Sequence, residues 1–148
     1  SNIIRIDPAT EEFEVVYEGS KAEPFYTAIR GTHETLENGN ILIVESMRGR
    51  LFEVDPEGEI VWQYTAENRR DFFSYTRGGN QRLPNGNTLI TSSDSGHVFE
   101  VTADGEIVWE FLNPEVDEVH ESRAAIYRLM RVYDHDAYPC LDRLDAKS

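Results

Sequence analysis

One stretch of the sequence is present twice. Residues 25–64 align with residues 72–111 without a gap, and 19 of the 40 aligned positions carry the same residue. Unrelated segments match at only a few positions, so the two stretches are copies of one unit, offset by 47 residues (72 minus 25). A duplication of this length constrains the fold strongly, because each copy must form the same supersecondary unit and bury its apolar face against a neighbour.

Each copy has the pattern of four short strands separated by turns. Gly39 and Gly86 each lie in an Asn-Gly-Asn sequence, which is typical of a tight turn because glycine and asparagine tolerate a positive φ. β-branched and aromatic residues fill the stretches between turns, and turn residues recur about every ten residues. In the first copy, the first expected strand ends at Leu36 and the other three cover 41–44, 51–54 and 59–64. In the second copy, the first expected strand ends at Leu83 and the other three cover 88–91, 98–101 and 106–111.

Four antiparallel strands in about 47 residues are typical of one blade of a β-propeller. The predicted fold class is therefore all-β, with blades of four antiparallel strands at 25–64 and 72–111. Trp62 and Trp109 occupy matching positions in the outer strands of the two blades. We expect them to be structural residues that pack between neighbouring blades.

The flanking residues extend the pattern to a partial propeller of about two and a half to three blades. Residues 3–17 match the second half of a blade. Residues 121–133 are expected to form a closing inner strand, with a short helix as the competing interpretation for part of them, and residues 134–148 a C-terminal tail. These elements do not close a ring of about four to eight blades. We expect the remaining blades to lie in the same chain; self-association that completes the ring, or a separate chain, are the alternatives.

Composition excludes several classes of partner. The chain has 28 acidic and 14 basic residues and a net charge of −14, which argues against nucleic acid as a partner because affinity there comes mainly from neutralising phosphates. No stretch approaches the ~20 apolar residues of a membrane helix, so we expect no membrane contact by this segment. Cys140 is the single cysteine, which excludes an internal disulfide and a cysteine-based zinc site. We expect no metal and no cofactor.

The first strand of each blade lines the central channel of a propeller, where we expect a ligand site. At matched positions of this strand the two copies carry His33 and Asn80, so the blades differ where function is expected. His33 is the candidate catalytic residue, as a general base, a nucleophile or a metal ligand. The alternative interpretation is that His33 only hydrogen-bonds a neighbouring strand.

The candidate substrate- or anion-binding residues surround this position. Arg30 and Arg77 recur in the two copies and are expected on neighbouring inner strands, where two guanidinium groups could converge on one oxyanion. Asn80 and His120 complete the candidate set. In the alternative interpretation the arginines pair with Glu34, Glu45 or a carboxylate of another blade.

Four blocks of the sequence form a recognisable set: 81–90, with Leu-Pro-Asn-Gly-Asn, 96–111, with Gly-Glu-Ile-Val-Trp, the pair Asn113-Pro114, and 126–131. With these blocks the chain resembles the arylsulfotransferase family of bacterial and archaeal β-propellers. The resemblance covers residues 1 to about 133 and only the C-terminal part of a family domain.

The resemblance implies a six-bladed propeller that moves a sulfuryl group between phenolic compounds through a transiently sulfated histidine. It implies no nucleotide sulfate donor, and aryl sulfates or phenols as small-molecule partners. On this sequence His33 lies where such a histidine is expected, and Arg30 and Arg77 where the sulfuryl oxygens would be held. The resemblance also suggests an exported, periplasmic or membrane-anchored protein.

Two functional hypotheses follow. The first is part of an arylsulfotransferase-like enzyme that works through His33. The second is a non-catalytic propeller module that binds a ligand or a protein partner. The fold supports both equally, and the surroundings of His33 distinguish them.

Overall fold

The computed structural model describes residues 1–27, 32–68, 72, 74, 78–117 and 122–133. Within these residues the regular structure is β, apart from one turn of 3-10 helix, η1 (Ser46–Arg48). The described residues contain no helix long and apolar enough to cross a membrane. The fold class is therefore all-β, as the repeat predicts.

The first blade is a four-stranded antiparallel sheet in the order β3-β4-β5-β6. Gly39 adopts a φ of 87° in the turn between its first two strands, a conformation that favours glycine. The central strand β4 is buried at all five positions, because it lies between other strands and is covered on both faces. The strands are β3 (Thr32–Thr35), β4 (Ile41–Glu45), β5 (Arg50–Val54) and β6 (Ile60–Thr65).

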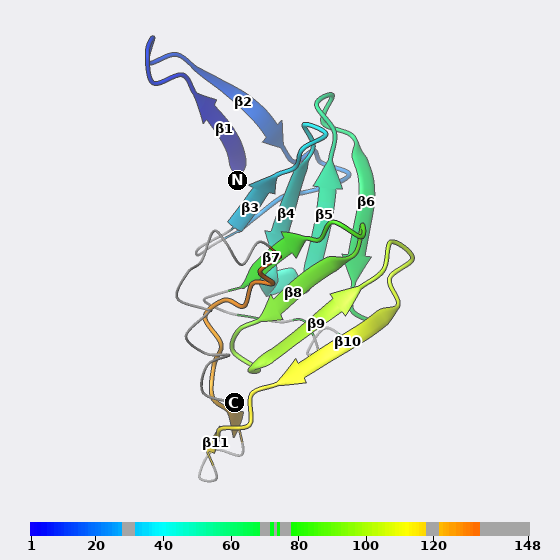
Figure 1. Cartoon of the computed structure of the whole chain (residues 1–148). Coiled ribbons are helices and arrows are strands. Elements are labelled where there is room, and N and C mark those ends of the chain that lie inside the picture. Colours follow the sequence, from blue (N-terminus) through cyan, green and yellow to red (C-terminus); the bar gives the residue numbers. More distant parts are fainter. Residues whose placement is uncertain (28–31, 69–71, 73, 75–77, 118–121, 134–148) are drawn as a thin grey trace.

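The second blade repeats this arrangement in the order β7-β8-β9-β10. Gly86 has the same φ of 87° as its counterpart Gly39. The strands lie within one or two residues of those expected from the repeat, and Figure 1 shows the two sheets side by side with β3 and β7 as their first strands. They are β7 (Gly79–Arg82), β8 (Thr88–Ser92), β9 (His97–Val101) and β10 (Ile107–Leu112).

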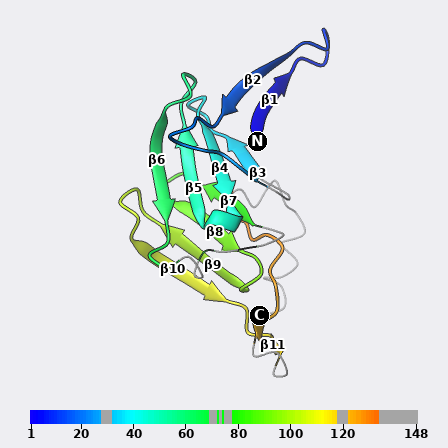
Figure 2. The same ribbon diagram turned by 180° about the vertical axis from the view of Figure 1, so that it is seen from behind.

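A two-stranded hairpin precedes the blades. It pairs β1 (Asn2–Ile6) with β2 (Phe13–Glu18), and its tip extends away from both sheets (Figures 1 and 2). These strands match the third and fourth strands of a blade, as the sequence predicts for this segment. One side of the hairpin packs on the first blade through Ile3 and Tyr17, whereas Ile4 and Ile6 are exposed.

Each contact between successive units is built around three aromatic rings. Tyr17, Phe25 and Phe52 lie with their ring centres 5.4 to 6.0 Å apart, between the hairpin and the first blade. The same trio, shifted by 47 residues, joins the two blades with ring centres 5.9 to 6.2 Å apart: Tyr64, Phe72 and Phe99. Aromatic pairs at such separations stabilise beyond their buried area, so one packing solution is used twice.

The expected closing strand takes a different form. Among the described residues after β10, a short hairpin pairs β11 (Val116–Asp117) with β12 (Ser122–Arg123), and residues 124–133 are neither strand nor helix. The physical reason is that a strand must pair with a neighbouring strand of the same blade, and the described residues contain no such neighbour for residues 124–133. It lies instead against the second blade, where the Ile126 and Leu129 amides donate to Ser93 O at 3.1 Å and Thr91 Oγ1 at 3.3 Å.

Candidate functional site

His33 lies in the first strand of the first blade, opposite Ile43 of β4. Its side chain is exposed and lines a pocket of about 230 Å³ between this strand and the β1–β2 hairpin. Ile3, Phe25 and Ile43 supply apolar wall, while Asn2 and Thr27 add polar groups. Among the residues that the structure describes, no partner forms a hydrogen bond with the His33 side chain, so the imidazole is accessible.

Asn80, at the matched position of the second blade, has different surroundings. It is only 5% exposed, and its Nδ2 donates a hydrogen bond of 3.2 Å to Glu34 Oε2 of the first blade. The same carboxylate oxygen accepts the backbone amide of Arg82 at 3.1 Å. Asn80 therefore links two blades, while His33 faces a pocket.

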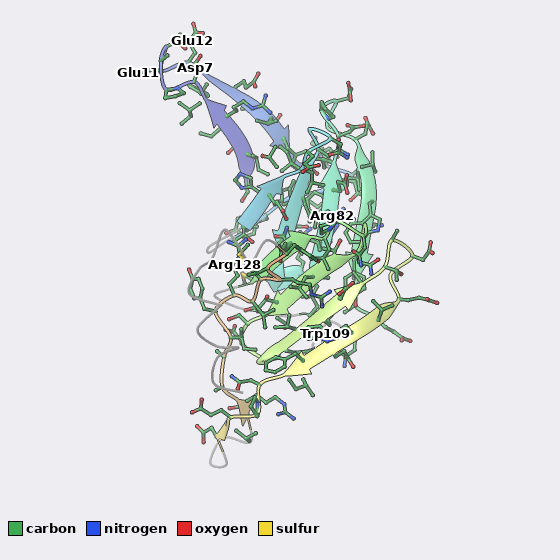
Figure 3. The ribbon with its side chains drawn as sticks, viewed as in Figure 1. Asp7, Glu11, Glu12, Arg82, Trp109 and Arg128 are labelled. Carbon is green, nitrogen blue, oxygen red and sulfur yellow. The ribbon has the colours of Figure 1, made fainter. Side chains whose placement is uncertain are left out.

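The remaining residues of the predicted anion site, Arg30, Arg77 and His120, lie outside the described residues. Two residues after Arg77, the chain is tightly packed at Gly79. A Cβ there would come within 3.1 Å of the Cγ of Arg128, an exposed residue labelled in Figure 3.

A cluster that the sequence analysis missed joins the two blades. Arg82 of β7 pairs with Glu53 of β5 through Nη2 and Oε2 at 2.5 Å, and its guanidinium lies 5.0 Å from the ring centre of Trp62. Glu53 also accepts Asn40 Nδ2 at 2.6 Å, and Trp62 Nε1 donates to Ala103 O at 2.8 Å. Asn38 Nδ2 also lies 3.5 Å from Glu53 Oε1. We call this set the interblade clasp: Glu53, Asn38, Asn40, Trp62 and Arg82.

The second blade has the equivalent clasp, with its arginine taken from the segment 124–133. Arg131 pairs with Glu100 through Nη1 and Oε2 at 2.5 Å and lies 5.3 Å from the ring centre of Trp109. Its backbone amide donates to Gln81 Oε1 at 2.8 Å, just as that of Arg82 donates to Glu34. The segment 124–133 therefore occupies the place of a next first strand, although it has no strand ladder.

The second clasp perturbs the acidity of its carboxyl group. Burial by itself would raise the pKa of Glu100, but hydrogen bonds from Asn87, Asn85 and Arg131, together with the charge of Arg131, outweigh it, and the pKa lies below its ordinary value. The carboxylate therefore stays ionised in its clasp. A signal for this cluster was present in the sequence, since both copies carry a glutamate at this matched position, Glu53 and Glu100, with apolar residues on either side.

The two tryptophans differ in exposure. Trp62 is half-buried between the blades, whereas Trp109 is 38% exposed, because the described residues form no further blade against β10. Figure 3 shows Trp109 on the outer strand of the second blade and Arg82 between the two sheets.

A larger pocket of about 590 Å³ lies between the two blades at their Asn-Gly-Asn turns. Its lining includes Glu34, Glu37, Glu53 and Arg82. Three of these residues are already engaged between the blades, because Arg82 of the second blade donates hydrogen bonds to Glu34 and Glu53 of the first. In the described ranges no three His, Cys, Asp or Glu residues are grouped so that they could hold a metal ion.

Comparison with solved structures supports a propeller-like fold. A streptogramin B lyase is similar with a TM-score of 0.55 and 16% identity over 77% of this chain and 34% of that one. A catalytically inactive virginiamycin B lyase from Staphylococcus aureus with quinupristin gives a TM-score of 0.52 and 13% identity over 76% of this chain and 34% of that one. This chain thus spans about a third of their length, and at such identity the likeness concerns the fold alone.

No curated protein matches the sequence. A family model, however, matches most of the chain, over residues 1–69 and 64–114, and its description is "Arylsulfotransferase (ASST)". The matched ranges contain the β1–β2 hairpin and both complete blades. The chain therefore belongs to the arylsulfotransferase family.

Proposed function

We propose that this protein transfers a sulfuryl group between phenolic compounds through His33. The observation that carries the proposal is the accessible imidazole of His33 on the first strand of a blade, in a chain of the arylsulfotransferase family. An enzyme of this kind needs a nucleophile that the donor can reach, and the exposed His33 meets that requirement while Asn80 is buried.

The pocket beside His33 suits an aryl sulfate. Phe25 and Ile43 give an apolar wall for the aromatic ring, and Asn2 and Thr27 offer polar groups near the same opening. A ligand with one apolar ring and one strongly polar group matches such a lining. Arg30 and Arg77 would hold the sulfuryl oxygens through charge-assisted hydrogen bonds.

The proposed reaction has two displacements at sulfur. A neutral ring nitrogen of His33 attacks the sulfur of the donor, a nitrogen–sulfur bond forms, and the sulfur–oxygen bond to the phenol breaks. The leaving phenolate takes a proton from water. A second phenol, losing its proton to water, then attacks the sulfur and releases His33 with the sulfuryl group transferred, so the protein ends unchanged.

The test uses the protein with its propeller ring complete, so that the central channel is closed. It is supplied with 4-nitrophenyl sulfate as donor and phenol as acceptor, and release of 4-nitrophenol is measured together with formation of phenyl sulfate. The variant His33→Asn introduces the residue that the second blade carries at this position, so it is the least disruptive change. We expect it to lower kcat at least a hundredfold.

The matched control is His97→Asn. His97 lies in β9, which β8 separates from the first strand β7 of the same blade, and its Nε2 lies 3.1 Å from Glu110 Oε1. We expect this variant to keep its activity. Equal activity of the His33→Asn variant and the parent would refute the role of His33, and absence of transfer by the parent would refute the proposed activity.

A second candidate function is a non-catalytic propeller that binds a ligand or a protein partner. The observation that favours it is Asn80, which shows that this strand position can serve a contact between blades. In that case binding of 4-nitrophenyl sulfate, measured by calorimetry, would persist without any turnover.

A further inference from the structure

The aromatic trio that joins successive units is incomplete at β10. Tyr17 and Tyr64 each pack on two phenylalanines of the unit that follows. Phe111 occupies the next position in this series, 47 residues after Tyr64, and it is 39% exposed. The ring of Phe111 therefore lacks the cover that its two predecessors have.

The rest of the β10 face shows the same difference. Ile107 and Trp109 are exposed, whereas their counterparts Ile60 and Trp62 in β6 are half-buried. The counterpart Trp62 donates its Nε1 proton to Ala103 O, in the turn between β9 and β10. This exposed face of β10, called the seat below, corresponds to the face of β6 that the second blade covers. It could take the third and fourth strands of a further blade, in which residues 124–133 already occupy the place of the first strand.

The β1–β2 hairpin has the complementary surface. It corresponds to the third and fourth strands of a blade, and its exposed Ile4 and Ile6 stand where β9 carries Phe99 and Val101. Pro8 stands where the other turn carries Ala103. The side of β1 that faces away from the first blade is therefore apolar at the positions that cover the preceding blade elsewhere in the fold.

We propose that the β10 face binds the β1–β2 hairpin of a second copy of this chain. By equivalence with the contact between the two blades, Phe111 would pack on the partner's Ile4, and Trp109 Nε1 would donate to the carbonyl of the partner's Pro8. The interaction continues an interface that the fold already uses twice. It goes beyond the proposed sulfuryl transfer and does not depend on it.

The interface is head-to-tail, because the two contacting surfaces are different. Such interfaces produce closed rings when the rotation between copies allows it. Each copy has two complete blades, and each junction would bring together the two strands of a hairpin and a segment 124–133, in three of the four strand places of a further blade. A ring of two copies would therefore contain four complete blades and two such junctions, each split between the copies.

The test is the mass of the full 148-residue chain in solution, measured by light scattering over a range of protein and salt concentrations. We expect twice the mass of one chain, and tighter association at higher salt, because each copy carries a net charge of −14 and screening weakens their repulsion. Ile6→Asp on the hairpin and Phe111→Asp on the seat should each reduce the mass to that of one chain.

A complementation experiment makes the test specific. A mixture of the Ile6→Asp and Phe111→Asp variants retains one intact hairpin and one intact seat, so it should recover the doubled mass, held by a single junction. Tyr26→Asp, at a residue 60% exposed and on neither surface, is the control and should remain dimeric.

A second measurement keeps the proposal testable if the aspartate variants misfold. In Trp62→Phe the only tryptophan is Trp109, and its fluorescence should shift to shorter wavelength as the protein concentration rises. A parent chain that stays single under all conditions would overturn the proposal. So would a dimer that survives both aspartate substitutions.

Discussion

The interblade clasp offers a direct measurement of what joins two blades. In the variant Arg82→Ala, Glu53 loses its only cationic partner among the described residues, and Trp62 loses the guanidinium 5.0 Å from its ring centre. The Glu53 side chain is 10% exposed, so water replaces the lost partner poorly. Removing one member of a buried ion pair costs about 3–5 kcal/mol.

Two features move the expected loss to the lower end of this range. Glu53 keeps the hydrogen bond from Asn40 at 2.6 Å, and the Arg82 side chain is itself 20% exposed. Loss of the cation–π contact adds about 0.5–1 kcal/mol. We therefore expect Arg82→Ala to lower the free energy of unfolding by about 3 kcal/mol.

The assay is equilibrium unfolding in urea, followed by tryptophan fluorescence and extrapolated linearly to water. The matched control is Arg5→Ala, which breaks an ion pair with Glu14 whose two side chains are both 61% exposed. That exposed pair should contribute about 0.5 kcal/mol. A double variant with Glu53→Gln should lose less than the sum of the single losses, because the amide removes the unpaired charge.

The reasoning would be refuted by a loss below about 1 kcal/mol for Arg82→Ala. It would also be refuted if Arg5→Ala destabilised the chain as much, because burial would then not govern the strength of these pairs. An equal loss of unfolding free energy in Arg82→Ala and Arg5→Ala would point to the change in net charge as the cause.

Three further predictions concern the packing, the turns and the acid response. Trp62→Ala should lower the free energy of unfolding by about 3 kcal/mol and Trp109→Ala, in the separated chain, by about 1 kcal/mol, because only the former lies between two blades; similar losses in urea unfolding would contradict this. Gly86→Ala should cost about 1 kcal/mol at a φ of 87°, and Gly86→Asn less, as thermal unfolding can check. Because the pKa of Glu100 is lowered in the folded chain, the stability that this carboxylate contributes is present above its ordinary pKa and is lost as pH falls below about 5. In the Glu100→Gln variant, the free energy of unfolding should therefore fall less steeply with decreasing pH. An unchanged slope would exclude this carboxyl group as a cause.

The blades could be predicted because every signal for them is local. Asn-Gly-Asn turns, β-branched and aromatic residues between the turns, and an ungapped repeat define eight strands, and all eight lie within two residues of the expected positions. The closing segment could not be predicted in the same way. Residues 124–133 have strand-forming residues, but a strand needs a neighbour with which to exchange hydrogen bonds, and whether one is present depends on the rest of the ring.

The candidate site was predictable only in part. The difference between His33 and Asn80 is visible in the aligned copies, but their exposure depends on which unit lies beside each first strand. The clasp was missed because Arg82 and Glu53 are 29 residues apart and belong to different blades. No local periodicity connects them, although the matched glutamates of the two copies, with apolar residues on either side, were the available clue.

The clasp also determines how a chain of this kind can change in length. The second blade carries both kinds of clasp partner: Arg82 on its first strand pairs with Glu53 of the blade before it, and Glu100 on its third strand pairs with Arg131 of the segment after it. The first blade differs, because Thr35 stands where the second blade carries Arg82. A second copy of the second blade, inserted directly after it, would bring an arginine for Glu100 and a carboxylate for Arg131. Tandem duplication of the second blade therefore leaves every clasp carboxylate paired without a second mutation, and blade number can increase there with no intermediate that has to fold with an unpaired ion.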